Sequence, residues 1–176
     1  LVERAKSELG PVDILVNNAG IAIVRGVDDL TEEDFDRTIT VNLKSAFLCT
    51  QAVLPMMRTR KWGRIVNISS IAALKAGSQM AVYDSSKAAL GGLMRNIAHT
   101  GARRGIRANL VYPGLVDTPN GREAGAGRPS RGKSQVPFGR QATAWEIAYA
   151  VLFFMSDESV YVTAQTLAVD SGLSGM

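Results

Sequence analysis

Two residues that could carry out acid–base chemistry lie one helical turn apart in AVYDSSKAALGGL, residues 81–93. Tyr83 precedes Lys87 by four positions, and residues four apart on an α-helix share a face, with Cβ atoms about 5–6 Å apart. A tyrosine has a pKa of about 10, too high for ready proton exchange at neutral pH. One ammonium about 4 Å away supplies the roughly 4 kcal/mol that lowers such a pKa by about three units. The pair is therefore either a proton donor with its electrostatic partner or two ordinary side chains on one helix face.

The composition describes one domain and excludes several classes of protein. The chain has 176 residues, 46% of them hydrophobic, with no apolar run near the length of a membrane span. Its basic stretches lack the interleaved aromatic residues of a nucleic-acid platform, and one histidine with one cysteine does not complete a zinc site. Because Cys49 is the sole cysteine, we expect it in the core of a cytoplasmic protein. We expect no signal peptide in the first residues, and neither nucleic acid nor a membrane among the partners.

Short apolar runs alternate with long helical patterns, which is typical of a parallel sheet with crossover helices. The residue pattern predicts strands within 12–20, 63–73, 105–118 and 164–172, with helices over about 31–57, 81–103 and 143–158. Residues 119–140 are rich in Gly, Pro, Ser and Arg and are predicted to form a flexible substrate loop. The whole chain, 1–176, is thus one α/β domain with a doubly wound parallel sheet.

The predicted strands end in unusual stretches. Asn17-Asn18-Ala19-Gly20 follows the first strand, Ser69-Ser70 the second, and Pro113-Gly114 the third. Ligands of open parallel sheets bind beyond the carboxyl ends of the strands, and the helix that begins near Tyr83 starts at this edge. The sequence therefore predicts that the pair lies where chemistry would occur.

Five motifs in order resemble those of the short-chain dehydrogenase/reductase family, and the likeness extends over essentially all 176 residues. They are NNAG at 17–20, Asn42 in TVNLKSAF, Ser70 thirteen residues before the tyrosine, Tyr83-x-x-x-Lys87, and YPGLVDT at 112–118. The resemblance implies a Rossmann-like fold and an NAD- or NADP-dependent enzyme that interconverts a carbonyl and a secondary alcohol; the residues do not distinguish NAD from NADP.

The resemblance also implies a role for each matched residue. Tyr83 would be the acid or base, Lys87 would hold the ribose hydroxyls, Ser70 would donate to the substrate oxygen, and Asn42 would help to order a proton-relaying water. The implied cofactor-binding residues are Asn18, Ala19, Gly20, Tyr83, Lys87, Pro113, Gly114, Val116 and Thr118.

Some family features are missing from these residues. No TGxxxGxG turn is present, and Leu1 falls within what resembles the helix before the family's fourth strand. We therefore expect the C-terminal portion of the domain, without its first strands and Gly-rich turn, and expect these residues alone to be poorly soluble and inactive. Asp84 and Ala164 stand where small residues and glycine, respectively, are usual in the family.

Two other classes of function are weighed against the enzyme. A serine hydrolase is disfavoured because Asn67-Ile68-Ser69-Ser70-Ile71 is not a G-x-S-x-G elbow, and Asp84 and His99 would lie about 22 Å apart along one helix. A non-catalytic scaffold of the same family stays open.

The resemblance also suggests a substrate type and an assembly. A sub-hypothesis is that Lys61 and Arg104, beside strand starts, help to bind an acidic carrier protein, as in the family's 3-oxoacyl-carrier-protein reductases. Family members commonly form homodimers or homotetramers through the two long helices and the last strand.

Overall fold

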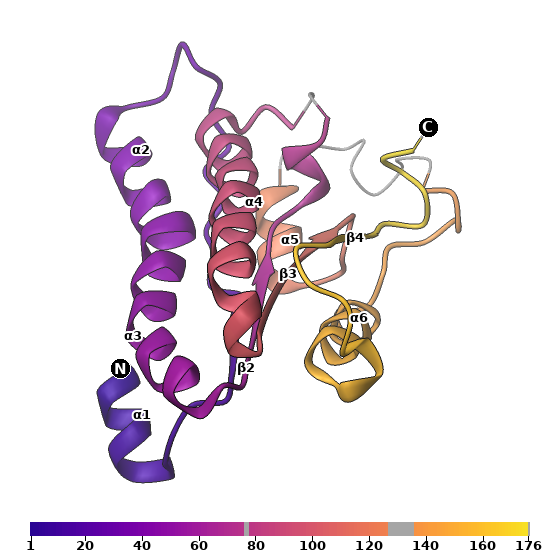
Figure 1. Cartoon of the computed structure of the whole chain (residues 1–176). Helices are drawn as coiled ribbons and strands as arrows, with labels where there is room; N and C mark the ends of the chain where they lie inside the picture. The colour runs from indigo at the N-terminus through magenta and orange to yellow at the C-terminus, as the bar shows by residue number, and fades with distance from the viewer. Residues whose placement is uncertain (76–77, 127–135, 176) are drawn as a thin grey trace.

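Four parallel strands form one sheet in the order β1-β2-β3-β4 in the computed structural model, which describes residues 1–75, 78–126 and 136–175 (Figure 1). The strands are β1 (Ile14–Asn17), β2 (Gly63–Ile68), β3 (Ile106–Pro113) and β4 (Thr166–Val169). The registers place Asn17 beside Asn67 and Ile68 beside Val111 in parallel strands, so the carboxyl ends of the strands lie at one edge. The predicted doubly wound α/β sheet is confirmed.

Helices cover both faces of the sheet (Figure 1). On one face lie α2 (Glu32–Ile39), the π-helix η1 (Thr40–Lys44), α3 (Ser45–Arg60) and α4 (Ala81–Gly101), with α1 (Val2–Leu9) against α3. On the other face α6 (Ala144–Met155) packs on β2, β3 and β4. The short helices are the 3-10 turns η2 (Ile71–Ala73), η3 (Ala102–Arg104) and η5 (Asp157–Ser159), together with α5 (Pro119–Ala124).

Alternate residues of the central strands enter two separate cores, because successive strand side chains point to opposite faces. Ile65 packs with Met57 and Met94 on the α3–α4 side, whereas the neighbouring Val66 packs with Val151 and others on the α6 side. Every residue of β2 is buried. A strand with no exposed face is what a central parallel strand requires.

Three expectations from the sequence need correction. The stretch 119–140 is not all loop, because Thr118 accepts a bond from the Gly121 N–H and caps α5, whose first residue is Pro119; residues 127–135 lie outside the described part. A proline at the first helical position after a threonine cap favours a helix start, a signal that the loop-like composition concealed. The helix predicted to end near Met57 continues to Arg60 and stops at Lys61 in the left-handed conformation. Cys49 is half-buried, not in the core.

The strand β1 lies at the edge of the sheet and pairs only with β2 among the described strands. Ile14 and Val16 are 41% and 38% exposed, so the apolar side chains of this edge strand are partly open to solvent.

No helix in the described part of the chain combines the length and the apolar character needed to cross a membrane.

Candidate active site

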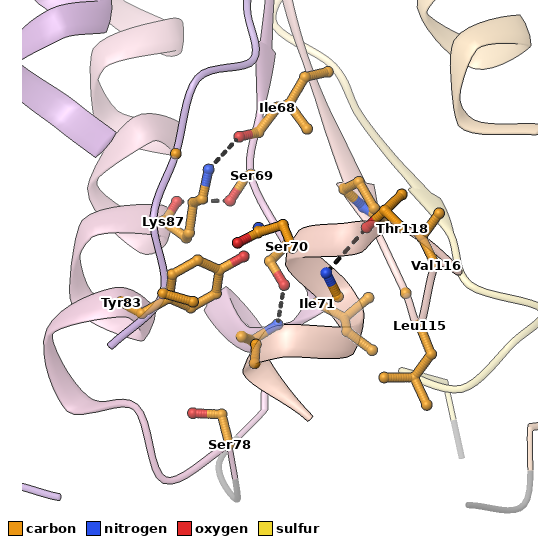
Figure 2. A pocket seen from close by; sticks show the side chains of 18 of the residues that line it. Ile68, Ser69, Ser70, Ile71, Ser78, Tyr83, Lys87, Leu115, Val116 and Thr118 are labelled. Atoms are coloured by element: carbon orange, nitrogen blue, oxygen red, sulfur yellow. Dashed lines mark hydrogen bonds between the residues drawn. The ribbon is translucent and has the colours of Figure 1, made fainter. Parts of the chain in front are cut away.

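A cleft of about 610 Å³ lies at the carboxyl ends of the strands and contains most of the residues singled out in the sequence (Figure 2). Its walls come from the turns after β1, β2 and β3 and from the first turns of α4 and α6. The lining includes Asn18, Gly20, Ser70, Tyr83, Lys87, Pro113, Gly114, Val116 and Thr118. Residues far apart in the sequence thus meet at one edge, as parallel strands predict.

Lys87 is a buried cation in this cleft. Its Nζ donates to the Ile68 carbonyl oxygen at 2.9 Å, and only 4% of the residue is exposed. Burial lowers the Lys87 pKa from 10.5 to about 8, because desolvation disfavours the charged form. The lysine is therefore held in place and remains largely protonated at neutral pH.

The half-buried ring of Tyr83 lies beside this lysine on the same helix face. The Lys87 Nζ is 5.7 Å from the ring centroid. Figure 2 shows the hydroxyl end of Tyr83 directed toward Ser70. The helical spacing anticipated from the sequence is realised in the structure, and it brings the two side chains together in the cleft.

Ser70 is presented by the turn after β2. Its Oγ accepts from the Ala72 N–H at 3.1 Å and caps η2. A hydroxyl is both donor and acceptor, so this bond leaves the Ser70 proton to be donated. The preceding Ser69 donates from Oγ to the Lys87 carbonyl oxygen at 2.7 Å and so ties the turn to α4.

Asn42 is buried behind the cleft, in the π-helix η1, and does not line it. Its Oδ1 accepts from the Ile21 N–H at 2.8 Å and its Nδ2 donates to the Ile21 carbonyl at 3.0 Å. The same Nδ2 donates at 3.0 Å to Ser86, which donates to the Tyr83 carbonyl at 2.7 Å. Asn42 therefore fixes the chain after NNAG to the helix of Tyr83, and π-helical insertions often occur at functional sites.

Gly20 approaches the lysine so closely that a side chain would interfere. A Cβ on this residue would lie 3.1 Å from the Lys87 Nζ and 3.4 Å from the Asn42 Oδ1. Asn18 lines the cleft beside it, whereas Ala19 does not. Of the three neighbouring residues predicted to bind the cofactor, Asn18, Ala19 and Gly20, two therefore line the cleft.

The opposite wall is formed by the Pro113-Gly114 turn and the residues after it. Gly114 abuts Asp170, whose Cβ would be 2.6 Å from a Cβ on the glycine. Val116 forms a parallel bridge with Ala142, and Thr118 caps α5. These contacts hold Val116 and Thr118 on the side of the cleft that faces Lys87.

The residues present fit the nicotinamide and ribose end of NAD or NADP. Gly20 leaves space at a buried ammonium, which suits ribose hydroxyls, and the Pro113-Gly114 wall offers an apolar surface with the Thr118 hydroxyl. When bound, the nicotinamide would supply or accept a hydride. In the described residues no group of three or more His, Cys, Asp or Glu side chains could hold a metal ion.

Sequence reasoning missed several residues of the site. Ser86 links Asn42 to α4, and its position three after Tyr83 on a helix was the available signal. Lys75, Ser78 and Leu173 also line the cleft, but no spacing in the sequence marks them. These residues reach the cleft because the segment after η2 lies against the segment that contains Leu173, and the two are far apart in the sequence.

Lys61 and Arg104 belong to two segments that meet at the other end of the sheet, Lys61 two residues before β2 and Arg104 directly before Gly105. A Cβ on Gly105 would collide with the Lys61 carbonyl oxygen, so the two segments touch. Since β2 has six residues and a strand rises about 3.3 Å per residue, this basic pair is about 20 Å from the cleft.

The chain is similar to known proteins over nearly its whole length. Residues 1–174 match the family described as enoyl-(acyl carrier protein) reductase. A 3-oxoacyl-[acyl-carrier-protein] reductase of Thermotoga maritima is 39% identical over 173 residues, which cover 98% of this chain and 70% of the relative. Dehydrogenase/reductase SDR family member 6 of Xenopus laevis is 38% identical, with 98% and 74% covered.

Solved structures show the same fold. A gluconate 5-dehydrogenase from Burkholderia cenocepacia, in complex with NADP and tartrate, superposes with a TM-score of 0.94 at 33% identity. The match covers 99% of this chain and 69% of that structure.

Proposed function

Because this chain belongs to the short-chain dehydrogenase/reductase family, we propose that Tyr83 is the acid–base residue of an NAD(P)-dependent oxidoreductase that interconverts a carbonyl and a secondary alcohol. The observation that carries the proposal is the buried Lys87 ammonium beside the Tyr83 ring in the cleft. A nearby cation favours negative charge on the tyrosine oxygen. Proton transfer from the hydroxyl to a carbonyl oxygen is thereby made easier.

The neighbouring residues assist in separate ways. The Ser70 hydroxyl donates to the substrate oxygen and orients it toward Tyr83, which the direction of the tyrosine hydroxyl supports (Figure 2). Lys87 binds ribose hydroxyls with its ammonium, and Thr118 and Val116 contact the nicotinamide end. Asn42 acts by position: it holds the Ile21 segment and, through Ser86, the first turn of α4.

The test is Tyr83→Phe in the protein expressed from its complete gene. Only the phenolic oxygen is removed, so turnover with carbonyl substrates should fall by at least about 100-fold. The dissociation constant for NADPH or NADH, measured by fluorescence titration, should change less than about threefold. Retained turnover would refute the role of Tyr83.

A 3-oxoacyl thioester is the first substrate class to examine, since the similar protein of Thermotoga maritima is a 3-oxoacyl-[acyl-carrier-protein] reductase. The contact between the Lys61 and Gly105 segments supports a basic docking surface for an acidic carrier. Lys61→Glu with Arg104→Glu should raise the KM for a carrier-linked substrate and leave the KM for its small thioester analogue unchanged. Equal effects on both would contradict carrier docking.

We also propose that the protein assembles as a homodimer or homotetramer. Exposed apolar side chains gather on α6, after η5 and on the edge strand β4, namely Trp145, Tyr149, Leu152, Phe153, Val160, Tyr161 and Leu167. A second set, Phe35, Phe47 and Leu48, lies on α2 and α3. Two such faces, each paired with its own copy about a two-fold axis, would generate a closed tetramer. Tyr149→Glu should halve the mass measured by light scattering, and an unchanged mass would contradict the α6–β4 interface.

A further inference from the structure

The charge of the cleft is one-sided. Among the described residues that line it, Lys75 and Lys87 are the charged ones, and both are cations. Lys87 donates to the Ile68 carbonyl at the floor of the cleft, and the proposed function assigns its remaining donors to the cofactor. Lys75 lines the cleft and is exposed, so it is accessible to a molecule that enters.

Lys75 is held in this place from two sides. It follows η2, the turn that Ser70 caps, and lies five residues beyond that serine. Its Nζ donates to the Leu173 carbonyl oxygen at 2.9 Å, and Leu173 lines the same cleft. An ammonium has three donors, so one bond fixes the head group while others remain for a ligand.

Two carboxylates lie in the surroundings of this ammonium. Asp170 accepts from the backbone N–H groups of Gly172 and Ser174 at 2.9 and 2.7 Å. Burial favours a higher Asp170 pKa, but hydrogen bonds from the Ser174 side chain and from the Gly172 and Ser174 backbones, with a smaller contribution from the charge of Lys75, lower the pKa overall. Asp84 shares a neighbouring hollow with Lys75 and accepts from the Ser78 hydroxyl at 2.5 Å. In the described residues neither forms an ion pair with Lys75, whose charge is therefore not neutralised by direct contact.

From these observations we infer that Lys75 binds a carboxylate of the substrate, so that the cleft selects carbonyl compounds or alcohols that also carry an acid group. The inference rests on the proposed function and names a free acid as the substrate class, in place of the 3-oxoacyl thioester considered above, which carries no carboxylate. Because the Ser70 hydroxyl is the proposed donor to the reacting oxygen of the substrate, the distance from Ser70 to Lys75 sets how far the acid group lies from that oxygen. A 3-10 turn rises about 2 Å per residue. At that rise the five residues from Ser70 to Lys75, three of which form η2, span about 10 Å, a separation that a lysine side chain and a short oxo or hydroxy acid can bridge.

The experiment compares Lys75→Met with wild type in the protein expressed from its complete gene. Methionine keeps most of the side-chain length and removes the charge. Lys6→Met, an exposed lysine on α1, is the matched control. The probes are short 3-oxo acids and their methyl esters, with a phosphorylated ketone and its unphosphorylated form as a second pair. Binding of the dicarboxylate tartrate, measured by calorimetry, is a readout that needs no turnover.

We expect wild type and Lys6→Met to prefer the acid over its ester. In Lys75→Met the KM for the acid should rise about 10- to 100-fold, as the loss of a charge-assisted bond implies, with little change in kcat or in ester kinetics. Tartrate binding should weaken in the same variant.

Equal losses on acid and ester, or an unchanged preference, would overturn the inference. A preference confined to the phosphorylated ketone would replace carboxylate by phosphate and would likewise overturn it. If no carbonyl compound is turned over by wild type, the proposed function fails, while tartrate binding that depends on Lys75 would still support the anion site. Absence of such binding in wild type would overturn that site as well.

Discussion

Replacing the buried lysine of the cleft should stabilise the fold at neutral pH while abolishing function. Burial lowers the Lys87 pKa from 10.5 to about 8. Each pKa unit is worth about 1.4 kcal/mol, so at pH 7 the charged lysine costs the folded protein about 3 kcal/mol. Lys87→Met removes this cost but also leaves the Ile68 carbonyl without its 2.9 Å donor, which costs about 1–3 kcal/mol. The expected net change at pH 7 is a gain of up to about 2 kcal/mol.

The pH dependence is more decisive than the net value. Below pH 8 the lysine is protonated in both the folded and the unfolded chain, so the full cost applies. Between pH 8 and 10.5 the folded protein has released the proton and the unfolded chain has not, so the free energy of unfolding of wild type rises with pH. From pH 7 to pH 10 wild type should gain about 2.5 kcal/mol relative to Lys87→Met.

Urea unfolding of both proteins across pH 7 to 10 measures this difference. Lys6→Met, which removes an exposed lysine, should give a curve parallel to that of wild type. A constant difference between wild type and Lys87→Met over the whole range would refute the argument that Lys87 is a desolvated cation.

Two further changes test the walls of the cleft, and a third tests the contact between Gly105 and Lys61 at the opposite end of the sheet. Gly20→Ala should raise the NAD(P)H dissociation constant about tenfold, since its Cβ would lie 3.1 Å from the Lys87 Nζ; unchanged binding in a fluorescence titration would show that this approach is unimportant. Thr118→Ala should raise the apparent KM of the cofactor more than that of the substrate in steady-state kinetics, and the reverse ranking would place Thr118 on the substrate side. Gly105→Ala should lower the free energy of unfolding by at least about 1 kcal/mol in urea, because φ is +67° and the new Cβ would meet the Lys61 carbonyl; a neutral effect would contradict that contact.

The sequence was informative where a physical period or a short-range rule applies. Alternation of apolar runs and helical patterns predicted the parallel sheet, and the i, i+4 spacing predicted that Tyr83 and Lys87 share a helix face, as the structure shows. The order of the strand ends predicted that Ser70 and the Pro113-Gly114 turn would meet at one edge. These features are encoded locally, by side-chain periodicity and by the topology of parallel strands.

Other features depend on contacts between distant segments. Only the tertiary structure showed that Asn42 is buried and hydrogen-bonded to the backbone of Ile21. In the sequence, a buried asparagine cannot be distinguished from a polar residue on the surface of a helix. Likewise Lys75 reaches the cleft through a bond to Leu173, 98 residues further along the chain. Local patterns thus determined which elements form and which residues lie at their ends. Burial and long-range hydrogen bonding decided which of those side chains became part of the site, since both depend on packing between elements that no single stretch of sequence contains.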